Sequence, residues 1–182
     1  MMVQGFQRVE KAPNLNIPRF FQEGIYAIDQ AIASFPKEGA KGSGTTMVAC
    51  IAEDNRLYWA SVGDSRLYII RGTQMKQATR DHNYELRLKE MRAAGQITDK
   101  ELMEARHKEA LISYLGMGNI SLMDINTVPF EMRFGDVIML CSDGITKVLS
   151  DDHIKQIITT EDLKPEERAE SLIETAIHTN TH

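Results

Sequence analysis

The sequence predicts a single domain of the α+β class. Two segments, residues 19–35 and 165–177, carry apolar residues at the three- and four-residue spacing of amphipathic helices. Between them, short apolar, aromatic and β-branched runs alternate with polar turns, as in antiparallel strands. The chain has 182 residues, 42% hydrophobic and 26% charged, which is enough to bury one sizeable core. We therefore expect one domain over residues 1–182.

The first predicted helix covers residues 19–35. Asn16 is expected to cap it, and Pro18 suits its first turn. Its apolar face is expected to comprise Phe21, Ile25, Ile28, Ile32 and Phe35. Three helix-breaking residues are expected to end it, namely Pro36, Gly39 and Gly42. Before it, we expect a short helical end and then a loop.

Four short strands are predicted next, in an antiparallel meander with tight polar turns. They fall at residues 47–52, 57–62, 67–70 and 75–78. Two further strands are predicted at residues 122–128 and 137–141. The last of these, Val-Ile-Met-Leu-Cys, is apolar on both faces. Such a run is typical of a central strand that is buried on both sides.

The sequence predicts a small helical hairpin over residues 84–110, inserted between strands. The segment is rich in charged residues, and its second helix is expected to begin at the capping box formed by Thr98 and Glu101. Its position suggests a flap, and a surface insertion without a role is the alternative. Beyond the strands, helices are expected to start at Ser150 and at Pro165.

Composition excludes several classes of function. The formal net charge of −5 leaves no basic excess for binding nucleic acid. No apolar run approaches the roughly 20 residues that span a bilayer, so no membrane partner is expected. The first residues contain no apolar segment that would serve as a secretory signal. Cys50 and Cys141 lie in apolar runs and are expected to be reduced, which favours a cytoplasmic protein.

Two aspartates stand where a predicted strand meets a turn. Asp143 follows the most apolar strand and precedes Gly144, and Asp64 lies in Gly63-Asp64-Ser65-Arg66 between two strands. Carboxylate oxygens are the ligands that Mg²⁺ and Mn²⁺ prefer. Asp-Gly and Gly-Asp are also among the commonest turn pairs, so on spacing alone a turn residue is the commoner role. His82 is a further candidate ligand, for which a structural role is favoured.

A set of short motifs follows in chain order, namely Gly44-Thr45-Thr46, Gly63-Asp64-Ser65-Arg66, Thr79-Arg80-Asp81-His82, Gly135-Asp136 and Leu140-Cys141-Ser142-Asp143-Gly144. This set resembles the PPM (type 2C) protein serine/threonine phosphatases, and the helical insertion is similar to the flap of the bacterial members. Each is weak alone, and the set in order is specific. The resemblance runs from about Phe20 to the C-terminus.

The resemblance implies a four-layer α-β-β-α sandwich of two antiparallel sheets flanked by helices. It also implies a binuclear Mg²⁺ or Mn²⁺ centre that activates water for attack on phosphoserine or phosphothreonine of a phosphoprotein substrate. On this pattern Asp143 is a catalytic residue and a ligand of the core metal centre. Asp64 matches the residue that serves a third, more weakly held metal near the flap.

Several features of the family are missing from the chain. These are the first Asp-Gly turn, the Asp-Asn pair on a last strand, and the family's phosphate-binding arginine. We therefore expect a domain that is incomplete at both ends, with unpaired sheet edges, weak metal binding and slow or no turnover. The alternatives are a catalytically inactive phosphatase-like module that binds or regulates, and a structural domain in which both aspartates only make turns.

Overall fold

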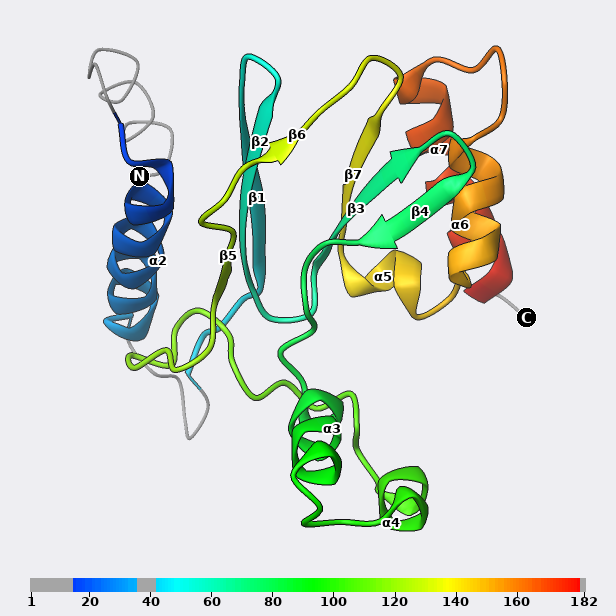
Figure 1. The fold of residues 1–182 in the computed structure, drawn as a ribbon. Helices are drawn as coiled ribbons and strands as arrows, with labels where there is room; N and C mark the ends of the chain where they lie inside the picture. The colour runs from blue at the N-terminus through cyan, green and yellow to red at the C-terminus, as the bar shows by residue number, and fades with distance from the viewer. Residues whose placement is uncertain (1–14, 36–41, 181–182) are drawn as a thin grey trace.

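The computed structural model describes residues 15–35 and 42–180 (Figure 1). The predicted helical end near the N-terminus, and Pro36 and Gly39, lie outside the described residues. The helices are α2 (Ile17–Ala33), α3 (Tyr84–Ala93), α4 (Asp99–Glu104), α5 (Asp143–Thr146), α6 (Asp151–Ile158) and α7 (Pro165–Asn180). The strands are β1 (Met47–Glu53), β2 (Arg56–Val62), β3 (Arg66–Arg71), β4 (Gln74–Gln77), β5 (Asp124–Ile125), β6 (Phe130–Glu131) and β7 (Val137–Cys141).

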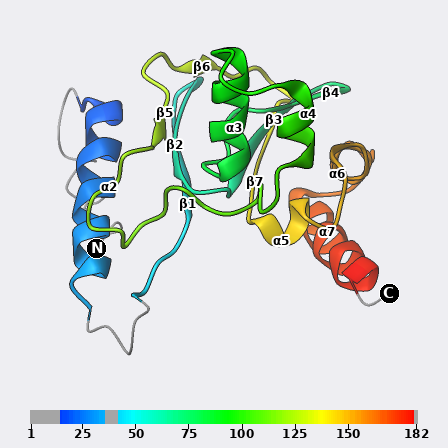
Figure 2. The same cartoon turned by 90° about the horizontal axis from the view of Figure 1, so that it is seen from below.

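Two antiparallel sheets form the centre of the molecule. One has the order β1-β2-β5, with β6 also paired to β2, and the other has the order β4-β3-β7. Figure 1 shows α2 outside the first sheet and α6 and α7 outside the second, which is the predicted α-β-β-α order. Helices α3 and α4 project from one end of the sheets (Figure 1), and the view from below shows them in front of the strands (Figure 2).

Helix α2 forms as the sequence predicts, with one correction to its apolar face. The Asn16 side chain accepts a hydrogen bond from the Arg19 amide at 3.1 Å, which caps the helix. The buried residues are four apart, namely Ile17, Phe21, Ile25 and Asp29. Phe35 was expected on this face and is instead 57% exposed. The helix ends at Ala33, so helical spacing no longer places Phe35 over the core.

The predicted four-strand meander is wrong at one connection. Strands β1 and β2 form a hairpin, and β3 and β4 pair, but β2 and β3 belong to different sheets. The chain changes sheet at Gly63, whose amide donates to Nδ1 of His82 at 3.1 Å and whose carbonyl accepts from the His82 amide at 2.9 Å. His82 thus occupies both backbone groups of Gly63, so β2 cannot continue into a ladder with β3.

Strand β7 has the predicted bounds but not the predicted central place. Within the described residues it pairs only with β3 and so forms an edge of its sheet. Leu140 on this strand is 40% exposed. Its apolar sequence therefore identified a strand but not its neighbours. The other predicted run, residues 122–128, forms only the two-residue strand β5.

Two hydrophobic cores lie on the outer faces of the sheets. The first packs α2 against β2, with Ala60 and Val62 fully buried. The second packs α6 and α7 against β3 and β7, around Tyr68 and Ile154. The predicted cap of α6 is present, since the Ser150 hydroxyl accepts from the His153 amide at 3.3 Å.

The turn before β7 is fixed to β3 by an ion pair. Arg71 donates to both carboxylate oxygens of Asp136, at 2.8 and 2.7 Å, and the Asp136 side chain is 3% exposed. The bidentate bond to Arg71 lowers the pKa of Asp136 to about 2. This pair holds the β3–β7 ladder in register at the end opposite Asp64 and Asp143.

The helical insertion has the predicted construction. The capping box is complete, because the Thr98 side chain accepts from the Glu101 amide and the Glu101 side chain accepts from the Thr98 amide. Across the described residues, the helices fall short of the length and apolar character that crossing a membrane requires.

Candidate functional site

Asp64 and Asp143 face one hollow of about 250 Å³. Their meeting follows from the register of the second sheet, in which Arg66 of β3 lies opposite Cys141 of β7. Asp64 precedes β3 by two residues and Asp143 follows β7 by two residues. In an antiparallel pair, such positions lie at the same end of the ladder. Two residues that are distant in the sequence are thus brought to one place.

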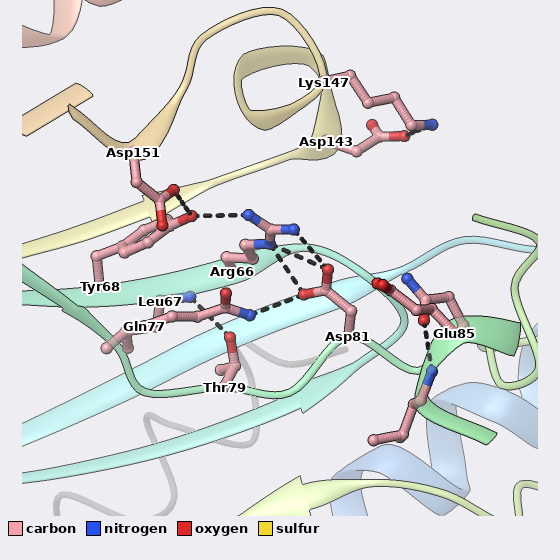
Figure 3. A network of polar contacts seen from close by, with 12 residues as sticks. Arg66, Leu67, Tyr68, Gln77, Thr79, Asp81, Glu85, Asp143, Lys147 and Asp151 are labelled. Atoms are coloured by element: carbon pink, nitrogen blue, oxygen red, sulfur yellow. Dashed lines mark hydrogen bonds and ion pairs between the residues drawn. The ribbon is translucent and has the colours of Figure 1, made fainter. Parts of the chain in front are cut away.

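Asp143 begins a short helix rather than a simple turn. It is the first residue of α5, and Lys147 is the residue that ends this helix. One helical turn separates them, and the Lys147 ammonium donates to Oδ2 of Asp143. Figure 3 shows the two side chains together beside the α5 turn. Lys147 was not among the residues predicted from the sequence.

The hollow has an excess of negative charge. Burial, and then the charge of Asp143, raise the pKa of Asp64. The hydrogen bond to Asp143 raises the pKa of Lys147, and the charges of Asp64 and Glu109 act in the same direction. Part of the shift at Asp64 comes from repulsion by the Asp143 carboxylate, and the shift at Lys147 shows that the surrounding carboxylates favour a cation.

A network centred on Arg66 forms one wall of the hollow (Figure 3). Arg66 binds the Asp81 carboxylate through Nε at 2.9 Å and Nη2 at 2.6 Å, and it donates to the Tyr68 hydroxyl at 2.9 Å. The Tyr68 hydroxyl donates to Asp151 at 3.0 Å, while Gln77 donates to Asp81 at 2.8 Å. Burial raises the pKa of Tyr68 to about 12. This network joins β3, the segment after β4 and α6.

Asp81 lines the hollow but is held by these partners. A carboxylate that already accepts a bidentate arginine and an amide has little capacity left for a metal ion. Its role is therefore to fix the wall. The sequence contains Arg66 and Asp81 only as parts of short motifs, and their pairing depends on the course of the chain after β4.

His82 has the structural role that was favoured for it. Its side chain is fully buried, and Nδ1 accepts from the Gly63 amide at 3.1 Å. Burial lowers the pKa of His82, which favours the neutral ring that this acceptor role requires. It does not line the hollow that contains Asp64 and Asp143.

The inserted segment also borders the hollow, through Glu85 of α3 and through Lys108 and Glu109 after α4. Oxygen donors of the class that Mg²⁺ and Mn²⁺ prefer are therefore present. Among residues 15–35 and 42–180, however, no three His, Cys, Asp or Glu side chains gather closely enough to hold a metal ion. Asp64 and Asp143 fit such a site in chemistry but do not complete one, and Lys147 already pairs with Asp143.

Comparison with known proteins finds matches to protein phosphatases. The family Protein phosphatase 2C matches residues 6–92. Protein phosphatase PhpP of Streptococcus pneumoniae is 33% identical over 136 residues, which are 75% of this chain and 53% of that protein. Serine/threonine phosphatase stp of Listeria innocua is 30% identical over 144 residues, 78% of this chain and 55% of that protein. The chain thus spans about half the length of these curated relatives.

Solved structures agree with the sequence matches. The serine/threonine phosphatase PstP/Ppp of Mycobacterium tuberculosis has a TM-score of 0.77 at 26% identity, covering 97% of this chain and 73% of that one. The S. agalactiae serine/threonine phosphatase has a TM-score of 0.77 at 26% identity, covering 92% and 69%. The catalytic domain of a PstP in complex with two manganese ions has a TM-score of 0.70 at 25% identity, covering 97% and 72%.

An α-β-β-α sandwich with carboxylates at the shared end of two strands defines the class of protein, that of the PPM-type phosphatase folds. The sequence matches agree with this class, because residues 6–92 match the protein phosphatase 2C family and the two relatives are protein phosphatases. Phosphatases of this family are metal-dependent, in agreement with the two manganese ions of the related structure.

Proposed function

We propose that this chain is part of a metal-dependent protein phosphatase that removes phosphate from phosphoserine or phosphothreonine. The single observation that carries the proposal is the meeting of Asp64 and Asp143 at one hollow. Both residues lie in motifs that resemble those of the protein phosphatase 2C family. The relatives of this chain are named as a protein phosphatase and a serine/threonine phosphatase. The proposed substrate is a phosphoprotein, and the proposed cofactor is Mg²⁺ or Mn²⁺.

In this proposal Asp143 and Asp64 are metal ligands, and Asp143 is the catalytic residue among those named. Bound divalent ions would lower the pKa of a water molecule and neutralise charge on the phosphoryl oxygens. The chain's own contribution is positioning. The β3–β7 ladder places the two carboxylates at one strand end, and the bidentate pair of Arg66 and Asp81 fixes the adjoining wall.

Metal binding by this chain is proposed to be weak and its turnover slow. The described residues bring Asp64, Asp143 and further carboxylates to the hollow, but no three of them lie close enough together to hold a metal ion. Mg²⁺ takes about six oxygen ligands in near-octahedral geometry. A site with few protein ligands leaves most positions to water, and the ion then dissociates readily.

A second candidate function is a phosphatase-like module that binds or regulates without catalysis. The ion pair between Lys147 and Asp143 favours it, because the ammonium group competes with a metal for the Asp143 carboxylate. The two functions differ in one measurable property. A phosphatase requires Asp143 for turnover, whereas a binding module has no turnover for Asp143 to affect.

The test is Mn²⁺-dependent release of phosphate from a phosphothreonine peptide. We expect slow hydrolysis that Asp143→Asn lowers at least about tenfold, because the change removes a ligand charge. Asp152→Asn is the matched control, since the Asp152 side chain is 93% exposed and pairs with Lys155 at the surface. It should leave the rate within about twofold. Equal rates for the unmodified chain and Asp143→Asn would exclude the phosphatase assignment of Asp143. Peptide binding without turnover would favour the second candidate.

A further inference from the structure

Lys147 occupies an unusual place for a surface lysine. Its ammonium is hydrogen-bonded to Oδ2 of Asp143, and it lines the same hollow as Asp64 and Glu109. The charges of these three carboxylates all act on it. Its side chain is 56% exposed and that of Asp143 is 40% exposed, so the pair lies at the mouth of the hollow and not in a sealed core.

The geometry is set by local structure. Asp143 and Lys147 are four residues apart on one helical turn, and this spacing brings an acidic and a basic side chain together on the same helix face. Asp64 comes from the strand end that the β3–β7 register fixes, and it lines the same hollow. The Lys147 ammonium is thus surrounded by carboxylates that different segments of the chain supply.

An ammonium ion and a divalent cation compete for such oxygens. Each reduces the repulsion between the carboxylates of the hollow, and each needs the electron pairs of the Asp143 carboxylate. Lysine is a compact point charge on a flexible stem, so it can leave the carboxylate without rearranging the helix. The pair is therefore reversible, unlike the bidentate bond between Arg66 and Asp81.

We propose that Lys147 is a built-in counter-ion that competes with the divalent metal for Asp143 and so sets the metal affinity of this site. The inference rests on the proposed function, because it takes Asp143 as a metal ligand. It adds a regulatory property: the site favours the metal-free state at low metal concentration, and the metal displaces the lysine when its concentration rises.

The test is a titration of the chain with Mn²⁺ alone, following free Mn²⁺ by electron paramagnetic resonance at low ionic strength. Lys147→Gln should lower the Kd for Mn²⁺ about tenfold, because it removes a competing charge in contact with a ligand. Lys147→Arg should keep the parent affinity within about threefold, because it keeps the charge. Lys100→Gln is the matched control, because it removes the same charge from an exposed ion pair. Lys100 pairs at 3.9 Å with Glu104, which lies four residues further along α4.

The outcomes separate this inference from the proposed function. Tighter binding in Lys147→Gln alone supports the competition. Equal gains in Lys147→Gln and Lys100→Gln would overturn it, because the effect would then be one of net charge. Weaker binding in Lys147→Gln would also overturn it, because Lys147 would then hold Asp143 in place for the metal.

Asp143→Asn is titrated in parallel. If it weakens Mn²⁺ binding while Lys147→Gln has no effect, only the competition fails. If it leaves the Kd unchanged, the metal assignment of Asp143 itself fails, and the competition fails with it. Thermal unfolding of every variant confirms that each is folded.

Discussion

Replacement of Gly63 by alanine is expected to lower the free energy of unfolding by about 3 kcal/mol. Gly63 has φ of +102°, which side-chain-bearing residues rarely adopt, and a Cβ atom there would lie 2.3 Å from Cγ2 of Thr46. The Thr46 hydroxyl is in turn hydrogen-bonded to Ser65 at 2.8 Å, so the threonine cannot turn away without losing that bond. Urea denaturation measures the change.

Gly72→Ala is the matched control for this substitution. Gly72 also has positive φ, +57°, but a Cβ atom there would meet nothing within 4 Å. We expect Gly72→Ala to lower the free energy of unfolding by only about 1 kcal/mol, because only the backbone conformation is unfavourable for alanine there. Equal losses at the two positions would show that the chain does not pass as closely over Thr46 as described. In Gly63→Ala, binding of Mn²⁺ should also weaken, because Asp64 is the next residue.

Asp29→Ala is the second change with a large expected effect, again about 3 kcal/mol in the free energy of unfolding. Asp29 is fully buried on α2, and its Oδ1 accepts from the amides of Gly116 and Gly118 at 2.7 and 3.1 Å. Alanine would leave both partly buried amides without this acceptor, and each such loss costs about 1–3 kcal/mol when the amide is shielded from water. Thermal or urea denaturation of the purified variant gives the value.

Two variants calibrate the result at Asp29. Asparagine retains an acceptor oxygen, so Asp29→Asn should lower the free energy of unfolding less than Asp29→Ala does. Gln30→Ala removes an exposed hydrogen bond to the same loop, from Gln30 to the Gly118 carbonyl at 2.7 Å, and should cost less than about 1 kcal/mol. If Asp29→Ala were as mild as Gln30→Ala, the loop at residues 116–118 would not depend on the buried carboxylate.

Much of the secondary structure could be predicted because its causes are local. Asn16, Ser150 and the capping box at Thr98 are recognisable from neighbouring residues, and each cap is present. The strand β7 was placed at its observed bounds by its apolar run alone. In these cases the physical cause lies within a few residues of its effect.

The errors arise where the cause is distant in the sequence. The change of sheet at Gly63 depends on His82, and the burial of Asp29 depends on the glycine amides near residue 116. No local pattern contains these partners. Strand β7 was predicted to be central because an apolar strand is the same at an edge and in the middle until its neighbours are known.

The candidate site also combines features that the sequence shows locally with features that depend on distant residues. The sequence identified Asp64 and Asp143 separately, and only the register of β3 against β7 places them together. Lys147 was overlooked although its four-residue spacing from Asp143 is visible in the sequence. That spacing has meaning only after Asp143 is seen to begin a helix, whereas the sequence had indicated a turn there.

Asp64 and Asp143 are proposed to form one metal-facing site, and paramagnetic broadening by Mn²⁺ in an NMR spectrum of the chain tests this arrangement. We expect the first amide signals to broaden to be those near Asp64 and Asp143 together, and Asp143→Asn to remove the effect at both. Broadening centred instead on an exposed acidic helix start, such as Glu166 and Glu167 of α7, with Asp64 and Asp143 unaffected, would contradict it.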